Sequence, residues 1–375
     1  MRGAELRPVA IAAGGTGGHF FPAEALASEL VARGRPVVLL TDARSGARSS
    51  PAFEGRERFI IAGGGIAGRG VVRAAGALAA LARGTLQARG ILARLRPAAL
   101  VGFGGYPSVA PVLACRLLGD RPAVILHEQN GVLGRANRML CRHASLLALS
   151  LEGTTRVPGR VRAVVTGNPV RPAIATLAGA PYVPPGDTIR LLVLGGSLGA
   201  RMLSEVVPPA LALLPESLRA RLAVTQQCRP EDLAQVRAAY AESGIRATLA
   251  PFFPAVAPLL AEAHLVIARA GASTVAELAA IGRPAVLVPL PAAIDDHQSA
   301  NARALEAVGA AWPMPQPDAT PAALAARLTA LLGDPATLRR AAAAAAGLGR
   351  PDAAARLADL VEQEIALRAN QESRA

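Results

Sequence analysis

Residues 268–301 read ARAGASTVAELAAIGRPAVLVPLPAAIDDHQSAN, and this stretch decides the predicted fold. The apolar run 264–268 before it predicts a buried strand, and a helix follows that begins at Ser273 or Thr274. A second apolar run opens into a proline-rich loop, and another helix begins near Asp296. Two strand–loop–helix units in succession place two helix N-termini at one edge of a parallel sheet. Free amide donors and the helix dipole favour an anion at such a place.

The same stretch also allows a purely structural interpretation. Thr274 and Glu277 have the spacing of a capping box, and Asp295 and Asp296 are typical first-turn carboxylates. Arginine, hydroxyl, carboxylate and His-Gln side chains gathered on consecutive loops favour a nucleotide site instead. Mg²⁺ could bind the two aspartates, but no cluster with metal-ligand spacing implies it. We therefore predict no metal site and no required cofactor.

Composition and charge limit the class of protein. The chain has 375 residues, of which 52% are hydrophobic, enough for two α/β domains. Its formal net charge is +13, and all 40 basic residues are arginines. This charge predicts anionic partners such as nucleotide phosphates or acidic lipid. Nucleic acid is excluded, because the sequence has no zinc-ligand spacing, no interleaved basic and aromatic residues and no RNA-binding signature.

The sequence also predicts where the protein is found. Its three cysteines, Cys115, Cys141 and Cys228, are widely spaced, as is typical of a reducing compartment. Residues 1–13 do not have the pattern of a signal peptide, and no stretch approaches the ~20 apolar residues of a spanning helix. We expect a cytoplasmic protein, either soluble or peripheral to a membrane.

A glycine-rich loop follows the first predicted strand. Residues 9–13 are apolar, residues 14–19 read GGTGGH, and a helix is predicted from Pro22 to Arg33. Asp42 follows the second strand at the distance expected for a dinucleotide-binding acid, but His19 and Phe20 replace the last glycine of that fingerprint. NAD binding is therefore the weaker interpretation. His19 lies at the carboxyl edge of the sheet, where doubly wound folds bind ligands.

Residues 63–96 alternate arginine with apolar residues and contain no acid. One interpretation is a helix with a buried face and a solvated arginine face. The other is a basic amphipathic patch for an anionic membrane surface, and the sequence leaves both open. The candidate membrane patch comprises Arg69, Arg73, Leu78, Leu81 and Arg83.

Further polar loops follow short apolar runs at the same predicted edge. The sequences are GFGGYPS at 102–108, HEQN at 127–130 and TGNPVR at 166–171. After a linker rich in Pro, Gly and Ala, a second strand and glycine loop, GGSLGA at 195–200, repeats the opening pattern. We predict two Rossmann-like domains with parallel sheets facing each other.

The ordered motifs GGTGGH, GFGGYPS, HEQN, TGNPVR, GGSLGAR, ARAGASTVAE and DDHQSANA resemble the MurG family. That family is the UDP-N-acetylglucosamine: N-acetylmuramyl-(pentapeptide) pyrophosphoryl-undecaprenol N-acetylglucosaminyltransferase. The resemblance runs from Ile11 to about Ala311 and implies an α/β, GT-B fold, with two Rossmann-like domains across a cleft. The expected organisation is an acceptor- and membrane-facing domain at 1–172, a linker at 173–186 and a UDP-GlcNAc-binding domain at 187–345. A helix at 352–370 would pack back on the first domain.

The resemblance also implies a donor site. Ser197 and Arg171 would lie near the diphosphate of UDP-GlcNAc. Glu277 would bind the ribose and Gln298 the sugar, and Phe253 falls where the backbone reads the uracil. The full set of implied donor residues is Thr16, Gly17, Gly18, Asn130, Arg171, Ser197, Phe253, Ala272, Ser273, Thr274, Val275, Ala276, Glu277 and Gln298.

The implied reaction is inverting transfer of GlcNAc to the 4-hydroxyl of undecaprenyl-pyrophosphoryl-MurNAc-pentapeptide, which converts lipid I to lipid II. The attack needs a general base, for which His19 is the candidate and Glu128 and His127 are the rivals. Gly104, Gly105 and Tyr106 are assigned to the acceptor. The expected place is the cytoplasmic face of the inner membrane, as a peripheral enzyme. An anionic membrane surface and cell-wall synthesis proteins are the expected partners.

Other classes of function stay open at this point. A soluble GT-B relative could be a natural-product glycosyltransferase or a UDP-GlcNAc 2-epimerase. An NAD-linked oxidoreductase would bind nicotinamide. A non-catalytic sugar-nucleotide or lipid-binding module would bind UDP-GlcNAc without releasing UDP.

Overall fold

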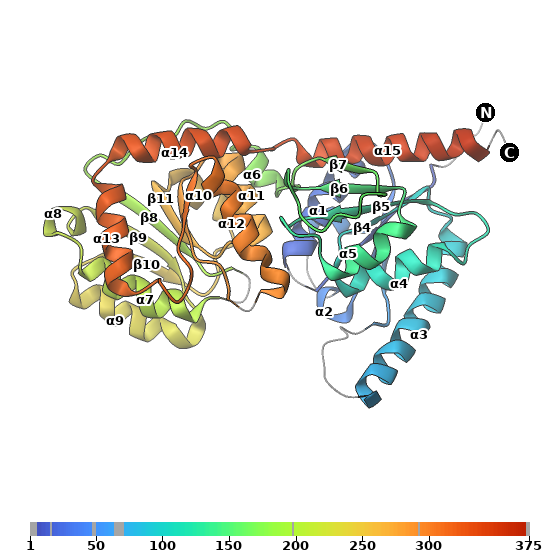
Figure 1. Cartoon of the computed structure of the whole chain (residues 1–375), viewed down its shortest axis with the longest axis horizontal. Helices are drawn as coiled ribbons and strands as arrows, with labels where there is room; N and C mark the ends of the chain where they lie inside the picture. Colours follow the sequence, from blue (N-terminus) through green and yellow to red (C-terminus); the bar gives the residue numbers. More distant parts are fainter. Residues whose placement is uncertain are drawn as a thin grey trace. The chain divides into compact units, whose positions relative to one another are not determined.

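The computed structural model describes residues 6–15, 17–46, 50–63, 71–196, 199–291 and 293–372 (Figure 1). The chain forms two compact units. Unit 1 contains Met1–Arg171 together with Asp352–Ala375, and unit 2 contains Pro172–Pro351. Thr16, Ser197 and Arg69, which carry predicted roles, lie outside the described residues, as does the side chain of Arg73.

Unit 1 is built on a seven-stranded parallel sheet in the order β3-β2-β1-β4-β5-β6-β7. Its strands are β1 (Val9–Ala12), β2 (Val37–Thr41), β3 (Arg58–Ile60), β4 (Ala99–Gly102), β5 (Ala123–Glu128), β6 (Leu146–Leu149) and β7 (Ala163–Val165). Its helices are α1 (Gly17–Ala32), α2 (Ala43–Gly46), α3 (Val71–Leu95), α4 (Gly105–Cys115), α5 (Arg135–Leu140) and α15 (Ala353–Glu372), with 3-10 turns η1 (Pro51–Phe53) and η2 (Cys141–His143). Every residue of β1, β2, β4, β5 and β6 is buried, which explains why these strands read as continuous apolar runs.

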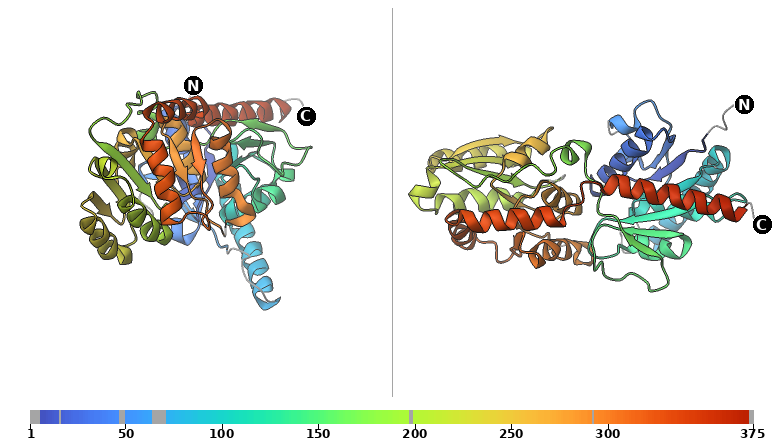
Figure 2. Two further views of the ribbon diagram at one scale, coloured as in Figure 1. Left: turned by 60° about the vertical axis from the view of Figure 1, so that its left-hand side comes forward. Right: turned by 90° about the horizontal axis from the view of Figure 1, so that it is seen from above.

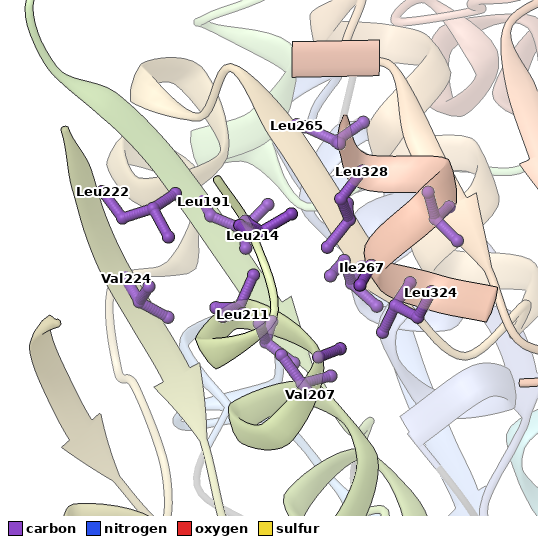
Figure 3. Packing of buried hydrophobic residues seen from close by; sticks show 14 of the residues in the cluster. Leu191, Val207, Leu211, Leu214, Leu222, Val224, Leu265, Ile267, Leu324 and Leu328 are labelled. Carbon is purple, nitrogen blue, oxygen red and sulfur yellow. The ribbon is translucent and has the colours of Figure 1, made fainter. Parts of the chain in front are cut away.

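Unit 2 is built on a six-stranded parallel sheet in the order β10-β9-β8-β11-β12-β13. Its strands are β8 (Ile189–Leu194), β9 (Leu222–Gln227), β10 (Arg246–Ala250), β11 (Leu265–Ala268), β12 (Ala285–Leu287) and β13 (Ala311–Pro313). Its helices are α6 (Pro172–Ala175), α7 (Arg201–Ala212), α8 (Glu216–Arg219), α9 (Leu233–Glu242), α10 (Val256–Glu262), α11 (Ala272–Ile281), α12 (His297–Ala307), α13 (Pro321–Leu332) and α14 (Pro335–Leu348), with 3-10 turns η3 (Pro230–Asp232) and η4 (Ile294–Asp296). Leucines of α7 and α13 pack against β8, β9 and β11 to form its core (Figure 3).

Both sheets have the strand order of a doubly wound fold. The chain direction across the sheet reverses between β1 and β4 in unit 1, and between β8 and β11 in unit 2. Ligands of such sheets bind outside the carboxyl ends of the strands at this reversal. The α/β class with two Rossmann-like units is confirmed, and each reversal marks where a site is expected.

The first helix begins earlier than the sequence predicts. We expected α1 to begin at Pro22, but it begins at Gly17, so that His19 lies in its first turn. Phe20 is buried and its ring lies 6.1 Å from that of Phe53. Burial of this aromatic side chain fixes the backbone around it in the helix and outweighs the weak helix propensity of the two glycines before it.

The predicted capping box in α11 is wrong. The helix begins at Ala272 with Gly271 as its N-cap, and no side chain caps it. Thr274 therefore lies in the first turn and cannot act as the cap that pairs with Glu277. In α12 the N-cap is Asp296, and both Asp295 (φ 57°) and Asp296 (φ 53°) are left-handed rather than first-turn helical residues.

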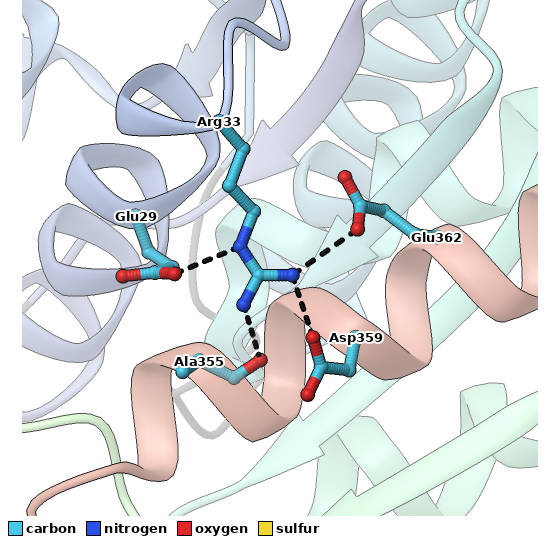
Figure 4. A network of polar contacts seen from close by, with 5 residues as sticks. All are labelled: Glu29, Arg33, Ala355, Asp359 and Glu362. Carbon is cyan, nitrogen blue, oxygen red and sulfur yellow. Dashed lines mark hydrogen bonds and ion pairs between the residues drawn. The ribbon is translucent and has the colours of Figure 1, made fainter.

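Helix α15 packs back on unit 1, where it contacts α1, β4 and β5 (Figures 1 and 2). Arg33 at the end of α1 holds it in place (Figure 4). Its guanidinium donates to Glu29 at 2.8 Å, to Asp359 at 2.6 Å, to Glu362 at 3.1 Å and to the carbonyl of Ala355 at 3.2 Å. One guanidinium that pairs with three carboxylates forms an ion-pair network. Such a network contributes to stability, whereas an isolated surface pair contributes little.

The segment predicted as a linker is attached to unit 2. Helix α6 opens it and contacts α11. Further on, the Tyr182 hydroxyl donates to the carbonyl of His264 at 2.8 Å, and the guanidinium of Arg283 lies 5.6 Å from its ring. The segment therefore packs as part of unit 2.

Candidate functional site

At the reversal point of unit 1, His19 meets the loop that follows β4. Gly104 (φ 78°) and Gly105 (φ 64°) are both left-handed, a conformation that favours glycine. A Cβ atom on Gly105 would lie 3.3 Å from His19 Cε1, and one on Gly104 would lie 3.2 Å from Asn137 Nδ2. The glycines therefore let the loop lie directly against the His19 imidazole. Tyr106 lies beside the first glycine loop, with its Cε1 3.9 Å from the Cβ position of Gly15.

Glu128, at the carboxyl end of β5, is buried and saturated with hydrogen bonds. Its Oε1 accepts from the amide of Asn130 at 3.1 Å and from the Asn130 side chain at 3.0 Å. Its Oε2 accepts from the amide of Gly134 and from the Asn137 side chain, both at 2.9 Å. A carboxylate with four donors holds the loop after β5 and the start of α5 together. These contacts fit a positioning role for Glu128 better than that of a proton acceptor.

His127, the other rival for the base, is fully buried. Its Nε2 lies 3.2 Å from the carbonyl of Gly167 and its Nδ1 lies 3.0 Å from the side-chain amide of Gln129. Burial, together with the nearby His19, lowers its pKa to about 4, although the hydrogen bond to the Gly167 carbonyl acts in the opposite direction. The ring is therefore neutral at pH 7, donating to Gly167 and accepting from Gln129. With both nitrogens engaged and no exposed surface, His127 packs with Phe103 (ring centroids 5.2 Å apart) as a support of the site.

Asp42 is committed to the glycine loop. Its Oδ2 accepts from the amide of Gly15 at 2.6 Å, and its Oδ1 accepts from the amides of Arg44 at 2.8 Å and Ser45 at 3.1 Å. Burial raises the pKa of Asp42, but these hydrogen bonds outweigh it and hold the pKa below its ordinary value. A carboxylate already satisfied in this way has no place for the ribose of NAD.

Other predicted residues of unit 1 lie near the same edge. Gly17 and Gly18 form the first turn of α1, whose amide groups have no acceptor within the helix itself. The guanidinium of Arg171 lies 5.2 Å from the ring of Phe21 on α1. Asn130 is held by Glu128, as described above. Thus side chains from β5, from the loop after β7 and from α1 come together at the carboxyl edge of one sheet.

In unit 2 the predicted nucleotide loop is the first turn of α11. Ala272, Ser273 and Thr274 are partly exposed there, at the carboxyl end of β11 and beside the reversal of the sheet. No side chain caps the amides of this turn, which can therefore bind an anion. In the second half of the segment, Val275 is buried and Ala276 is partly exposed. Glu277 is only 6% exposed.

The remaining predicted donor residues are divided between two loops. Gln298 lies in the first turn of α12, and its Oε1 accepts from the amide of Leu290 at 3.0 Å. This hydrogen bond connects the first turn of α12 to the loop after β12. Phe253 lies between β10 and α10 and is partly exposed, whereas its neighbour Phe252 is 69% exposed.

Two residues that shape these edges, Arg269 and Asn301, lie within motifs of the sequence but were given no individual role there. Arg269 donates to the carbonyls of Val288 and Pro289, both at 3.1 Å, and to the side chain of Gln316 at 2.7 Å. Burial lowers its pKa. Asn301 donates to the carbonyl of Ala270 at 3.0 Å. The position of Arg269 directly after a buried strand was a signal in the sequence for its role. Nothing in the local sequence pattern indicates the role of Asn301.

Within the described ranges, no group of three or more His, Cys, Asp and Glu side chains could hold a metal ion. In the same part of the chain, no helix is long and apolar enough to cross a membrane.

Comparison with known proteins adds to this geometry. The glycosyltransferase family 28 N-terminal domain matches residues 9–148, and the family 28 C-terminal domain matches residues 190–357. The chain is 62% identical over 361 residues to the UDP-N-acetylglucosamine--N-acetylmuramyl-(pentapeptide) pyrophosphoryl-undecaprenol N-acetylglucosamine transferase of Granulibacter bethesdensis. This match covers 96% of the chain and 94% of that protein.

Solved structures of two other glycosyltransferases are similar to this chain in fold. The crystal structure of Acinetobacter baumannii MurG is similar with a TM-score of 0.77 and 32% identity, over 95% of this chain and 99% of that one. The glycosyltransferase of kitacinnamycin is similar with a TM-score of 0.69, over 96% of this chain and 100% of that one. Its identity is 18%, so it shows the fold alone.

Proposed function

This chain belongs to the MurG family of glycosyltransferase family 28, and from that membership we infer that it transfers GlcNAc from UDP-GlcNAc to undecaprenyl-pyrophosphoryl-MurNAc-pentapeptide. The 62% identity to a transferase of that name, over 96% of the chain, carries the inference. The product is lipid II, so the enzyme acts in peptidoglycan synthesis. A natural-product glycosyltransferase shares only the fold at 18% identity. The satisfied carboxylate of Asp42 argues against the NAD-linked alternative.

The proposed chemistry exchanges one glycosidic bond for another. The acceptor 4-hydroxyl attacks the anomeric carbon of GlcNAc, the bond from that carbon to UDP breaks on the opposite face, and the configuration inverts. The hydroxyl proton passes to a base, and negative charge develops on the leaving diphosphate. We assign the proton to His19, because Glu128 and His127 are both engaged in holding the surrounding loops.

The leaving diphosphate needs donors that are already in place before the reaction. We assign this role to the uncapped first turn of α11, whose amides lie at the positive end of the helix dipole. The partly exposed Thr274 lies in that turn and can add a hydroxyl donor, whereas the hydroxyl oxygen of Ser273 is buried. Donor binding is accordingly assigned mainly to unit 2, with Glu277 on the ribose.

The inferred activity is tested by measuring UDP release from UDP-GlcNAc with and without a lipid-linked MurNAc-pentapeptide acceptor. Release should depend on the acceptor and should equal the GlcNAc found in the product. Release of UDP without an acceptor, with formation of a free sugar, would instead indicate a hydrolase or an epimerase. Binding of UDP-GlcNAc without any UDP release would indicate a non-catalytic module.

We propose further that the enzyme is peripheral at the cytoplasmic face of the inner membrane, alongside other cell-wall synthesis proteins in growth and division. Helix α3, which projects from unit 1 in Figure 1, is the proposed contact. Leu78 is 67% exposed and Leu86 is 64% exposed, and they lie on one face of the helix with exposed Arg83 and Arg89 near them. We predicted Leu81 as part of this patch. It packs against the core of unit 1 instead and is therefore not part of the exposed patch.

Vesicle co-sedimentation tests this contact. Each basic side chain near an anionic surface contributes about 1 kcal/mol, so changing Arg69, Arg73 and Arg83 to Glu should weaken binding to anionic vesicles at least ~100-fold. Binding of the wild type should also fall as salt is added. The exposed unit 2 residues Arg237, Arg246 and Arg327 changed to Glu alter the net charge by the same amount and provide the control. Equal binding by the wild type and the triple variant would remove α3 from the membrane interface.

A further inference from the structure

A polar pocket lies at the edge of the unit 1 sheet opposite to the candidate site. It has a volume of ≈ 410 Å³ and lies beside Ala123, the first residue of β5, and beside Ser145 and Arg162, which precede β6 and β7. The candidate active site lies at the other end of these strands. Because β5 has six residues, Ala123 and Glu128 are roughly 16 Å apart along the strand. The pocket is therefore separate from the site described above.

The pocket is strongly basic. Six of its lining side chains are basic: Arg116, Arg121, Arg142, His143, Arg162 and Arg368. A single acid, Glu364, lines it with them, and it pairs with Arg162. Among the described residues, Arg116, Arg121 and Arg142 form no ion pair with a carboxylate. Positive charge thus collects from the end of α4, from η2, from the residue before β7 and from α15.

Two guanidinium groups face a single imidazole at the centre of this cluster. Arg116 Nη1 lies 3.0 Å from His143 Nδ1, and Arg142 Nε lies 3.1 Å from His143 Nε2. A neutral imidazole has only one nitrogen that can accept a hydrogen bond, so it cannot satisfy both donors. Burial and then the charges of Arg142 and Arg116 hold the pKa of His143 below its ordinary value. Within the described residues, neither a carboxylate nor this imidazole therefore balances the charges of both Arg116 and Arg142.

Two other arginines of the described residues are arranged differently. Arg33 pairs with three carboxylates, and Arg229 pairs with Asp232 and Glu231. Arg116, Arg121 and Arg142 are exposed, and an anion bound between them would reduce the repulsion of their like charges. A carboxylate ligand fits one guanidinium fork, whereas a phosphate presents enough oxygens to accept from several arginines at once. The pocket therefore fits a phosphate group best.

We propose that this pocket, at the amino edge of the unit 1 sheet, binds a phosphate-class anion through Arg116, Arg121, Arg142 and His143. This binding site is distinct from the sites for sugar donor and acceptor, and its occupancy does not depend on the transferase reaction. Two sources supply the same chemistry, namely free phosphate and the phosphodiester of an anionic lipid headgroup. The 48% exposed Leu367 in the pocket lining and the 49% exposed Leu117 beside Arg116 would suit a headgroup with acyl chains nearby.

The test compares the wild type with the double variant Arg116→Ala, Arg142→Ala, using the full chain. Inorganic phosphate is titrated by calorimetry, and binding to vesicles of phosphatidylglycerol and of phosphatidylcholine is measured separately. Losing a charge-assisted hydrogen bond weakens binding by about tenfold or more, so the double variant should lose at least that factor. The unit 2 double variant Arg237→Ala, Arg327→Ala should bind as the wild type does.

Each outcome decides the proposal. Phosphate binding that the pocket variant loses supports a free anion as the source. Vesicle binding that the pocket variant loses, without binding of free phosphate, supports a lipid headgroup. Equal binding by the wild type and the pocket variant with both probes overturns the proposal. As a local readout, phosphate should raise the pKa of His143 in NMR titrations of the wild type. Arg121→Ala serves as a second variant if the double variant folds poorly.

Discussion

Replacing His19 with alanine is expected to lower kcat by ~10²–10⁴-fold, which is the usual contribution of a positioned general base. UDP-GlcNAc binding should persist, because the donor is assigned mainly to unit 2. His19 lies in the first turn of α1 with the Gly105 loop directly against its ring. If the imidazole accepts the proton, the wild-type kcat should also fall at low pH, where a protonated imidazole cannot act as a base, and the alanine variant should lose that acid limb.

Glu128→Gln is the informative comparison for this experiment. The amide group keeps the shape of the carboxylate but presents a donor where Gly134 or Asn137 already donates. We therefore expect a lower melting temperature and an activity loss caused by misplaced loops, with the acid limb of the pH profile retained. If His19→Ala remains active and Glu128→Gln abolishes turnover without loss of stability, the base is Glu128.

The sequence predicted the sheets well, because buried parallel strands are continuous apolar runs. The runs around Val9 and Leu265 both form strands where predicted, and the polar loops after them lie at the carboxyl edges. Helix starts were less predictable. Gly17 and Gly18 resemble a loop in sequence, yet the burial of Phe20 brings them into α1. A glycine destabilises a helix by about 1 kcal/mol relative to alanine, which is less than the free energy gained by burying one aromatic side chain.

The roles of individual site residues depended on contacts between distant parts of the chain. HEQN was recognised as a polar cluster, but the sequence does not show that Glu128 receives donors from Gly134 and Asn137. Likewise, the arginine-rich segment gives no periodic signal that separates Leu81, which packs on the core, from Leu78, which is exposed. Such distinctions require the three-dimensional packing of α3 against the rest of unit 1.

Replacing Glu277 with glutamine is expected to raise the KM for UDP-GlcNAc by ~10–100-fold, with kcat affected less. The proposed contact is a charge-assisted hydrogen bond from the ribose hydroxyls, typically worth about 1.5–3 kcal/mol, and the neutral amide would lose it. The structural alternative in which Glu277 completes a capping box is excluded by the N-cap at Gly271, where no side chain caps the helix. Glu277 instead lies in the second turn of α11, behind the proposed diphosphate-binding turn, and is 6% exposed.

The Glu277 measurement has a matched control in Glu306→Gln, because Glu306 lies exposed on the neighbouring helix α12. That variant should leave both kinetic constants and the melting temperature unchanged. For Glu277→Gln, steady-state kinetics over a range of UDP-GlcNAc concentrations should be combined with thermal unfolding with and without UDP. We expect a raised KM and a near-normal melting temperature. UDP should also raise the melting temperature less than it does in the wild type, because a ligand stabilises the folded protein only to the extent that it binds. An unchanged KM together with a lowered melting temperature would show that Glu277 serves the packing of α11 and not the donor.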